Sequence, residues 1–390
     1  MGVVGDGAAL VADGVLLEVG PSRRVENLAV ARDAVEINAA GRVVMPGFID
    51  CHTHLAFPPP DVADEHREAA ARALVADTAK RTAARWLAYI GAMARHGTTT
   101  VEIKTGAGPN EDAEKKMLRI LSILQDEPLD VVPTFLFKLP PREAMNQAAF
   151  EEYAKRLFAD LFPRIRKRNL ARFADLAWDA EPLHHPWFDR YLAAARAAGF
   201  KCKVHADGMN AAAAIAMAVR NLAVSIDHLE HARPSEVSML AGSPTMATLL
   251  PCASFHSGQG NAPARVLVDA GVPIALGSNF HARHNPTLNM QTVVSLACLR
   301  LGLTAAEAIS AATINGAHAL GRAEKTGSLE PGKEADIVIL NVSDYRDLAS
   351  HFGANLVHAT MKRGEMIYRE GNIVAPRSRN KLTGTSLVLH

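Results

Sequence analysis

Val43-Val44-Met45-Pro46-Gly47-Phe48-Ile49-Asp50-Cys51-His52-Thr53-His54-Leu55 is the stretch that decides the fold and the chemistry of this chain. A Pro-Gly turn leads into a short apolar run, which is typical of a buried strand, and the run ends in His-Thr-His. Side chains at positions i and i+2 of a strand point to the same face. His52 and His54 are therefore expected to project together and to bind one metal ion. Cys51 faces the opposite way, so we do not expect it to be a ligand.

The composition and net charge of the chain argue against some classes of binding partner. The chain has 390 residues, a formal net charge of +1, and 48% hydrophobic and 21% charged residues. So small a net charge gives no electrostatic case for nucleic acid or an acidic membrane surface. No apolar run reaches the length of a membrane span, and no basic segment followed by an apolar one suggests a secretion signal. The four scattered cysteines indicate reduced thiols, so we expect a cytoplasmic protein.

After His54 the sequence alternates between strand-like and helix-like patterns. Alternation of this length favours a parallel sheet. Together with the strand before His52 there are eight strands, which predicts an α/β fold with a closed (β/α)8 TIM barrel; a doubly wound open sheet is the alternative. The later strands are expected at 98–104, 129–138, 172–178, 201–205, 223–228, 245–250 and 273–277. The helices are expected at 64–96, 111–125, 147–168, 186–198, 209–220, 234–241, 262–270, 286–301 and 304–312.

The two ends of the chain are β-like and broken by Gly and Pro. We expect residues 1–46 and 326–390 to combine into one small discontinuous β-sandwich domain, with residues 47–325 forming the barrel.

In such barrels the chemistry lies at the carboxyl ends of the strands. Several histidines occur at the expected ends, which favours a divalent ion held by imidazole nitrogens with one position open for water. The polar residues at these ends are His52, His54, Glu102, Lys104, Lys138, Asp179, Glu181, His205, Asp207, Asp227, His228, Glu230, Asn279 and His281.

These motifs together resemble the amidohydrolase superfamily and, within it, the imidazolonepropionases. The likeness rests on the Pro-Gly-Phe-Ile-Asp-Cys-His-Thr-His segment, on Lys203-Val-His-Ala-Asp207, on Ser225-Ile-Asp-His-Leu-Glu230, and on the Gly-x-Leu-x-x-Gly-x-x-Ala-Asp pattern from Gly327 to Asp336. Further matching pieces lie at 97–104, 134–136, 263–271 and 311–315, so the likeness covers nearly the whole chain.

The resemblance implies a (β/α)8 barrel, a small β-sandwich and a homodimer. It also implies one divalent metal per chain, expected to be Zn²⁺ with Fe²⁺ as the alternative. By resemblance the metal ligands are His52, His54, His205 and the strand-eight residue Asn279, while His228 polarises the group under attack.

Departures from the family pattern fall on the substrate contacts. Asp61 stands near an expected carboxylate-binding Arg, Ala107 replaces a Tyr, and Gly208 replaces a Glu. A His expected in the loop after the third strand is absent, and Asn279 replaces an Asp. The resemblance therefore argues for the reaction class and against the substrate of the imidazolonepropionases.

Asn279 leaves the catalytic base open, because an amide oxygen can bind a metal but cannot take up a proton at neutral pH. Asp207, on the same face as His205 if the strand continues, is one candidate base, and Glu230 and His281 are others. A further interpretation is that Asn279 is a deliberate replacement of Asp that traps a ligand.

The expected substrate contacts are six polar residues. Lys138 binds an anionic group or, when carboxylated, bridges two metals, and Arg283 substitutes for the missing Arg. The full set is Lys138, Asp61, Lys104, Glu230, His281 and Arg283.

The sequence thus predicts a metal-dependent amidohydrolase. It would use a metal-activated water on a C–N bond, or an exocyclic C=N or C=S bond, of a small imidazolone- or hydantoin-like heterocycle. The alternatives are a deaminase or desulfurase of a related cyclic ureide or thioureide, and a non-catalytic scaffold protein with the same fold.

Overall fold

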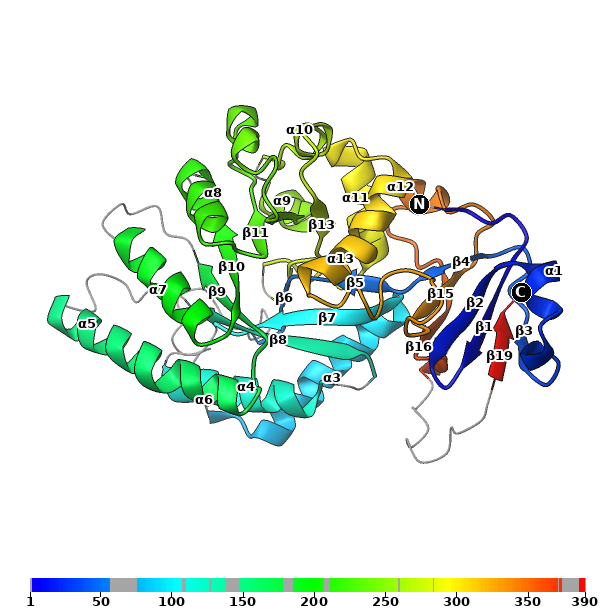
Figure 1. The fold of residues 1–390 in the computed structure, drawn as a ribbon, viewed down its shortest axis with the longest axis horizontal. Coiled ribbons are helices and arrows are strands. Elements are labelled where there is room, and N and C mark those ends of the chain that lie inside the picture. Colours follow the sequence, from blue (N-terminus) through cyan, green and yellow to red (C-terminus); the bar gives the residue numbers. More distant parts are fainter. Residues whose placement is uncertain are drawn as a thin grey trace.

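A parallel barrel carries the main body of the chain, with two small sheets beside it (Figure 1). The structure is a computed structural model that describes residues 2–56, 76–106, 110–125, 128–137, 147–177, 185–206, 211–258, 260–282, 284–370, 372–373 and 386–389.

The main sheet has eight strands in sequence order, and each strand is parallel to its neighbour. This order confirms the (β/α)8 barrel and excludes the doubly wound alternative. Most of the strands are buried along their whole length, as expected for a parallel sheet covered by helices. The strands are β5 (Phe48–Asp50), β7 (Thr98–Lys104), β8 (Asp130–Phe137), β9 (Phe173–Ala177), β10 (Lys201–Ala206), β11 (Ser225–His228), β12 (Met246–Leu249) and β13 (Ile274–Leu276).

The barrel is closed by a pair of short strands that directly follow its first and last strands in sequence. Strands β6 (Thr53–His54) and β14 (Phe280–His281) pair in parallel, with His54 opposite His281. The Asn279 backbone N–H donates to the His52 carbonyl oxygen at 3.0 Å, and the Cys51 thiol donates to the Leu276 carbonyl oxygen at 3.3 Å. The segments that carry the predicted site residues therefore also join the two edges of the sheet.

Helices cover the outside of the barrel (Figure 1), most of them close to their predicted positions. The single helix expected at 64–96 is wrong in its described part, because residues 77 and 78 are not helical and Thr78 caps a helix that begins at Ala79; residues 57–75 lie outside the described residues. The helix expected from residue 286 begins at Met290. The barrel-side helices are α3 (Ala79–Arg95), α4 (Glu111–Ile123), α5 (Gln147–Arg156), α6 (Phe162–Lys167), α7 (His185–Ala197), α8 (Ala211–Arg220), α10 (Ala264–Asp269), α11 (Met290–Leu301) and α12 (Ala305–Ala311). The helix expected at 147–168 contains a π-helical turn at Leu157–Leu161, and the one expected at 234–241 is a 3₁₀ helix, Pro234–Met239. Four short α-helices in the described residues were not predicted: α1 (Ser22–Glu26), α9 (Pro251–Ser257), α13 (Ile314–Ala319) and α14 (Asp347–Ser350).

The terminal segments combine into two small sheets, as the sequence indicates. One has the order β2-β1-β19-β3 and the other β18-β17-β16-β15-β4. A shared apolar cluster packs between them, including Val11, Leu16, Ile337, Ile339 and Met361. The strands are β1 (Gly7–Ala12), β2 (Val15–Pro21), β3 (Val35–Ile37), β4 (Val43–Pro46), β15 (Ile337–Leu340), β16 (Val357–Lys362), β17 (Glu365–Arg369), β18 (Asn372–Ile373) and β19 (Ser386–Leu389).

A single glycine joins a small sheet to the barrel. Gly47 lies between β4 and β5, and a Cβ atom there would meet the Thr99 side chain at 2.2 Å. Only glycine allows the two chain segments to approach so closely. Pro46-Gly47 is therefore the point at which the chain passes from the small sheet into the barrel.

A buried ion network ties the start of β8 to the small sheets. The Asp130 carboxylate accepts from Lys362 Nζ at 2.9 Å and from Arg363 Nη2 at 2.5 Å, and it also pairs with Arg322. Lys362 in turn bonds Asp336 at 2.6 Å. Across the described ranges, we find no helix with the length and apolar character that crossing a membrane requires.

Candidate metal centre

Four histidines meet at the carboxyl ends of the barrel strands. His52 follows β5, His54 lies on β6, His205 on β10, and His228 ends β11. The Nε2 atoms of His52 and His54 are 3.1 Å apart, and those of His205 and His228 are 3.0 Å apart. The ring centroids of His52 and His205 are separated by 4.8 Å.

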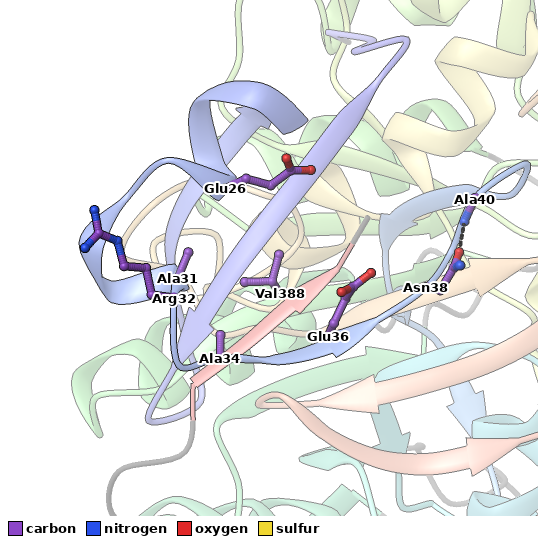
Figure 2. A pocket seen from close by; sticks show the side chains of 8 residues that line it. All are labelled: Glu26, Ala31, Arg32, Ala34, Glu36, Asn38, Ala40 and Val388. Atoms are coloured by element: carbon purple, nitrogen blue, oxygen red, sulfur yellow. Dashed lines mark hydrogen bonds between the residues drawn. The ribbon is translucent and has the colours of Figure 1, made fainter.

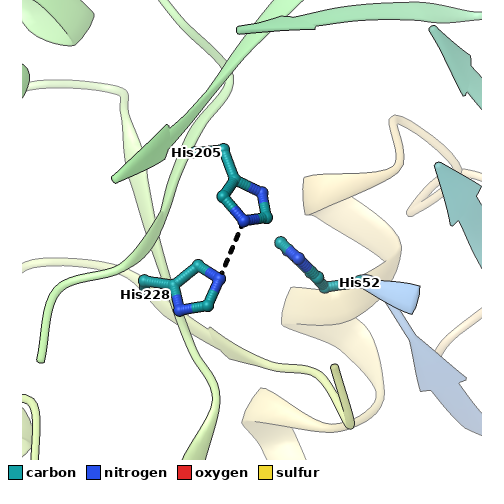
Figure 3. Close-up of side chains that lie close together, drawn as sticks. All are labelled: His52, His205 and His228. Carbon is teal, nitrogen blue, oxygen red and sulfur yellow. Dashed lines mark hydrogen bonds between the residues drawn. The ribbon is translucent and has the colours of Figure 1, made fainter. Parts of the chain in front are cut away.

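Three of these rings offer a ready set of metal ligands. His52, His205 and His228 come from three strands and point toward one another (Figure 3), with one ring nitrogen of each within 4.8 Å of the others. Zinc–nitrogen bonds of about 2.0–2.1 Å place two ligand nitrogens roughly 3.3 Å apart in a tetrahedral site. The separations of 3.0 and 3.1 Å are close to that value.

A carboxylate orients His52 toward the cluster. Asp227 Oδ2 lies 2.7 Å from His52 Nδ1, and both side chains are fully buried. Because a carboxylate only accepts, this contact places the ring proton on Nδ1 and leaves the Nε2 lone pair facing the other histidines. Burial, followed by the charge of Lys104, holds the pKa of His52 well below its usual value. His52 is therefore neutral and in the tautomer that binds metals through Nε2.

A second carboxylate supports His228. Glu230 lies 3.2 Å from His228 Nδ1 and is itself largely buried. Burial alone would raise the pKa of Glu230, but His228 outweighs it and holds that pKa below its usual value. The pair keeps a proton on His228 Nδ1 and turns Nε2 toward His205. His228 and Leu229 both have positive φ, 84° and 70°, so the chain bends sharply where this pair is held.

The strand-eight residue supplies an oxygen of the right kind. The Asn279 Oδ1 atom is buried and has no hydrogen-bond partner among the residues that the structure describes. The residue has φ of 52°, and its backbone N–H is bonded to His52. An orphaned amide oxygen on a residue bonded to the His52 backbone, together with the converging imidazole nitrogens, fits a divalent ion, so the donor set suits the expected metal.

Charged side chains fill the barrel directly below the histidines. Lys104 Nζ lies 2.5 Å from Asp175 and 2.9 Å from Asp227, and Lys203 Nζ lies 2.7 Å from Glu102. All five side chains have no exposed surface. Burial opposes the charge on Lys104, but Asp175, Asp227 and Glu102 outweigh it and hold its pKa well above the usual value. Three carboxylates against two ammonium groups leave an excess of negative charge, which favours a cation above them.

Asp50 adds a carboxyl group at the barrel seam. It accepts from the Ser278 backbone N–H at 2.9 Å and from Ser278 Oγ at 2.6 Å. Burial raises the pKa of Asp50 to about 7 in spite of these bonds. The group joins the first strand to the last without adding a full charge at neutral pH.

The remaining predicted residues are placed as follows. His281 on β14 lies 6.1 Å from His54 between ring centroids, and Glu230 contacts His228. Lys104 is enclosed within the buried charge layer. The predicted residues Asp61, Lys138, Asp207 and Arg283 lie outside the described residues.

Sequence reasoning does not single out the charge layer. Asp175 and Lys203 are not among the predicted site residues, and Glu102 and Asp227 are predicted only as polar residues at strand ends. A signal was present, because Glu102-x-Lys104 and Lys203-x-His205 each place two ionisable residues on one face of an expected strand.

A separate cavity of about 560 Å³ lies in the small β-sheets (Figure 2). Its lining residues come from the N-terminal segment and β19, whereas all four clustered histidines belong to the barrel. The lining is formed by Glu26, Ala31, Arg32, Ala34, Glu36, Asn38, Ala40 and Val388.

Known proteins resemble this chain over most of its length. A model of the amidohydrolase family matches residues 61–375. An imidazolonepropionase from Porphyromonas gingivalis is 36% identical, covering 94% of this chain and 90% of that protein. One from Symbiobacterium thermophilum is 37% identical, covering 95% and 92%, and one from Geobacillus kaustophilus is 34% identical, covering 96% and 92%.

Solved structures share the fold at low identity. A 5-methylcytosine deaminase from Klebsiella pneumoniae superposes with a TM-score of 0.73 at 15% identity, covering 94% of this chain and 95% of that one. An adenosine deaminase from Xanthomonas campestris with bound zinc gives a TM-score of 0.69 at 19% identity, covering 95% and 90%.

Proposed function

The chain belongs to the amidohydrolase family and is a hydrolase of carbon–nitrogen bonds other than peptide bonds; on that premise we propose a specific site and substrate class. The enzyme holds one zinc ion, or Fe²⁺ in its place, through His52, His54, His205 and the Asn279 oxygen. The ring-nitrogen distances group His228 with His52 and His205; we assign His54 as the ligand in its place because the family resemblance gives the His-x-His pair that role. It hydrolyses a bond of a small imidazolone- or hydantoin-like heterocycle.

The observation that supports this proposal best is the convergence of the histidine Nε2 atoms, with His52 oriented by Asp227. A divalent ion bound there supplies a water of lowered pKa and polarises an oxygen of the substrate. Imidazolonepropionases, the relatives at 34–37% identity, support a cyclic amide or amidine as the substrate.

The protein's own residues have distinct roles in the proposal. His228 would act as an imidazolium: Glu230 accepts from its Nδ1–H and stabilises the positive charge, and its Nε2–H donates to the group under attack. Asn279 cannot take up the proton of the attacking water. That proton passes instead to Asp207, the acidic group two residues after His205, with Glu230 and His281 as the other candidates.

The metal content of freshly purified full-length protein tests the first half of the proposal. We expect close to one equivalent of zinc or iron per chain. Less than about half an equivalent would favour a scaffold protein that has kept the fold without the metal.

A panel of substrates tests the second half. Imidazolone and hydantoin rings report ring opening, and amino- or thio-substituted rings report deamination and desulfurisation. We expect ring opening by the wild-type chain and its loss in Asp207→Ala. Turnover of substituted rings alone would assign the enzyme to the deaminases or desulfurases.

Two further expectations belong with the proposal. The resemblance implies a homodimer, which light scattering on the purified protein measures. The cysteine pattern implies a cytoplasmic enzyme, which fractionation of the source cells measures.

A further inference from the structure

Lys104 occupies an unusual place for a lysine at the end of a barrel strand. Its side chain has no exposed surface, and its ammonium group lies between Asp175 at 2.5 Å, Asp227 at 2.9 Å and Glu102 at 3.5 Å. An ammonium enclosed by three carboxylates has no donor directed at the mouth of the barrel. Lys104 therefore acts on its carboxylate partners and not on a ligand at the barrel mouth.

One of these partners, Asp227, is the carboxylate that bonds the proposed metal ligand His52. Asp227 Oδ2 accepts hydrogen bonds from Lys104 Nζ, at 2.9 Å, and from His52 Nδ1, at 2.7 Å. Its other oxygen, Oδ1, accepts from Ser225 Oγ at 2.6 Å. Three donors fix the carboxylate in the plane that meets His52.

We propose that Lys104 is a positioning residue that acts through Asp227 to hold His52 in the orientation and tautomer that present Nε2 to a metal. This inference rests on the proposed function. Without Lys104, the Asp227 carboxylate keeps only Ser225 on Oδ1 and His52 on Oδ2, so it is held by two contacts instead of three. The imidazole then loses its fixed direction, and ligand affinity depends on that direction.

The barrel contains a matched control. Lys203, on β10, is equally buried in the same charge layer, and its Nζ bonds Glu102 at 2.7 Å and the Cys51 carbonyl oxygen at 3.4 Å. Glu102 accepts from Thr134 Oγ1, and its described contacts include no histidine. Lys203→Met therefore removes a buried cation of the same layer that bonds neither Asp227 nor His52, so the hydrogen bond between those two residues stays in place.

The experiment compares zinc affinity in Lys104→Met, Lys203→Met, Asp227→Asn and the wild type. Each full-length protein is stripped with a chelator and titrated with zinc against a chromophoric competitor, and circular dichroism confirms that each is folded. We expect the affinity to fall by about 10–100-fold in Lys104→Met and Asp227→Asn, the usual range for the partner of a ligating His. Lys203→Met should change it by less than about threefold. Asp227→Asn keeps the test decisive if Lys104→Met does not fold.

A second readout needs no metal. Nitrogen NMR of the histidine rings in the stripped protein, with His52 assigned from a His52→Asn spectrum, reports which ring nitrogen carries the proton. We expect Nδ1–H in the wild type and in Lys203→Met, and a mixture of tautomers in Lys104→Met.

The outcomes separate the two proposals. A wild type that binds no zinc overturns the metal site but leaves the tautomer measurement valid. A wild type that binds zinc, with Lys104→Met unchanged in both affinity and tautomer, overturns the role of Lys104. An equal loss of affinity in Lys203→Met also overturns it, because the effect would then be a general one of removing buried charge.

Discussion

His205 and His228 bring their Nε2 atoms to 3.0 Å although they end two different strands. Strands β10 and β11 pair so that His205 faces Asp227 and Ala206 faces His228 across the ladder. Side chains alternate along a regular strand, so His228 would face away from Asp227 if β11 continued regularly. The positive φ of His228 and of Leu229, 84° and 70°, marks the bend at which the His228 ring meets His205.

Single histidine replacements should separate metal binding from chemistry. We expect His54→Ala to lose most of its zinc, because it removes a proposed ligand, and His228→Ala to keep its zinc and lose turnover. Metal analysis and turnover of the ring substrates measure the two effects. His351→Ala serves as the control, since His351 is exposed and bonds only to the end of its own short helix, α14 (Asp347–Ser350). Loss of zinc in His228→Ala would make His228 a ligand.

Replacing Asn279 by Asp should leave kcat nearly unchanged. The substitution keeps the oxygen for the metal and adds a group that can take up a proton, but in the proposal Asp207 already supplies the base. The measurement is kcat at neutral pH on the best ring substrate, with zinc content as the control. An increase of about tenfold or more, together with an active Asp207→Ala, would instead show that the base is missing from the wild type and that position 279 restores it.

The ion network at Asp130 should carry a large share of stability. Removing one partner of a buried ion pair costs about 3–5 kcal/mol, so we expect Asp130→Asn to lower the free energy of unfolding by roughly 3 kcal/mol. The comparison variant is Asp344→Asn, whose pairing with Arg346 is solvent-exposed and should be silent in the same denaturant titration.

The effect of Asp130 should also depend on pH in a defined direction. Burial would raise the pKa of Asp130, but Lys362, Arg322 and Arg363 outweigh it and lower that pKa from its usual 3.8. The folded state therefore binds this proton less readily than the unfolded state. The contribution is complete above about pH 4 and is lost as the pH falls below it. A gap between wild type and Asp130→Asn that stays constant down to pH 3 would contradict this account.

Thiol reactivity should reveal one accessible cysteine. Cys51, Cys202 and Cys252 are buried, and burial raises the pKa of Cys202 and of Cys252 to about 12. Cys298 is only half-buried. Because the thiolate is the reactive form, we expect a disulfide reagent at pH 8 to modify Cys298 first and the other three only on unfolding. Cys298→Ser should abolish the fast phase, and rapid reaction of Cys51 would contradict its contact with Leu276.

The barrel and the histidines were accessible from sequence because they rest on short-range periodicity. Residues 98–104 read as a strand and form β7, and His205 and His228 fall at the strand ends where they were expected. Alternation along a strand is a local property, and the carboxyl-end rule then supplies the site.

How deep in the barrel a polar side chain lies could not be predicted from sequence in the same way. Lys104 was expected at the substrate, whereas its ammonium lies under the histidines. The level in the barrel at which an inward side chain lies depends on the tilt and stagger of the closed strands, which no local pattern states. Helix α9 was missed for a related reason: its sequence, Pro-Cys-Ala-Ser-Phe-His-Ser, is too short to show a helical period.

The pairing of β6 with β14 has a consequence for how the enzyme is made. Asp50 and Ser278, which bond across this seam, are 228 residues apart in sequence. During translation His52 and His54 leave the ribosome long before the strand that holds them in place, so the nascent barrel remains open for most of its synthesis. A ribosome stalled ahead of residue 280 would therefore display a chain with a nearly complete sheet and no closed seam. The proposed metal site can therefore be completed only after the last barrel strand has emerged from the ribosome.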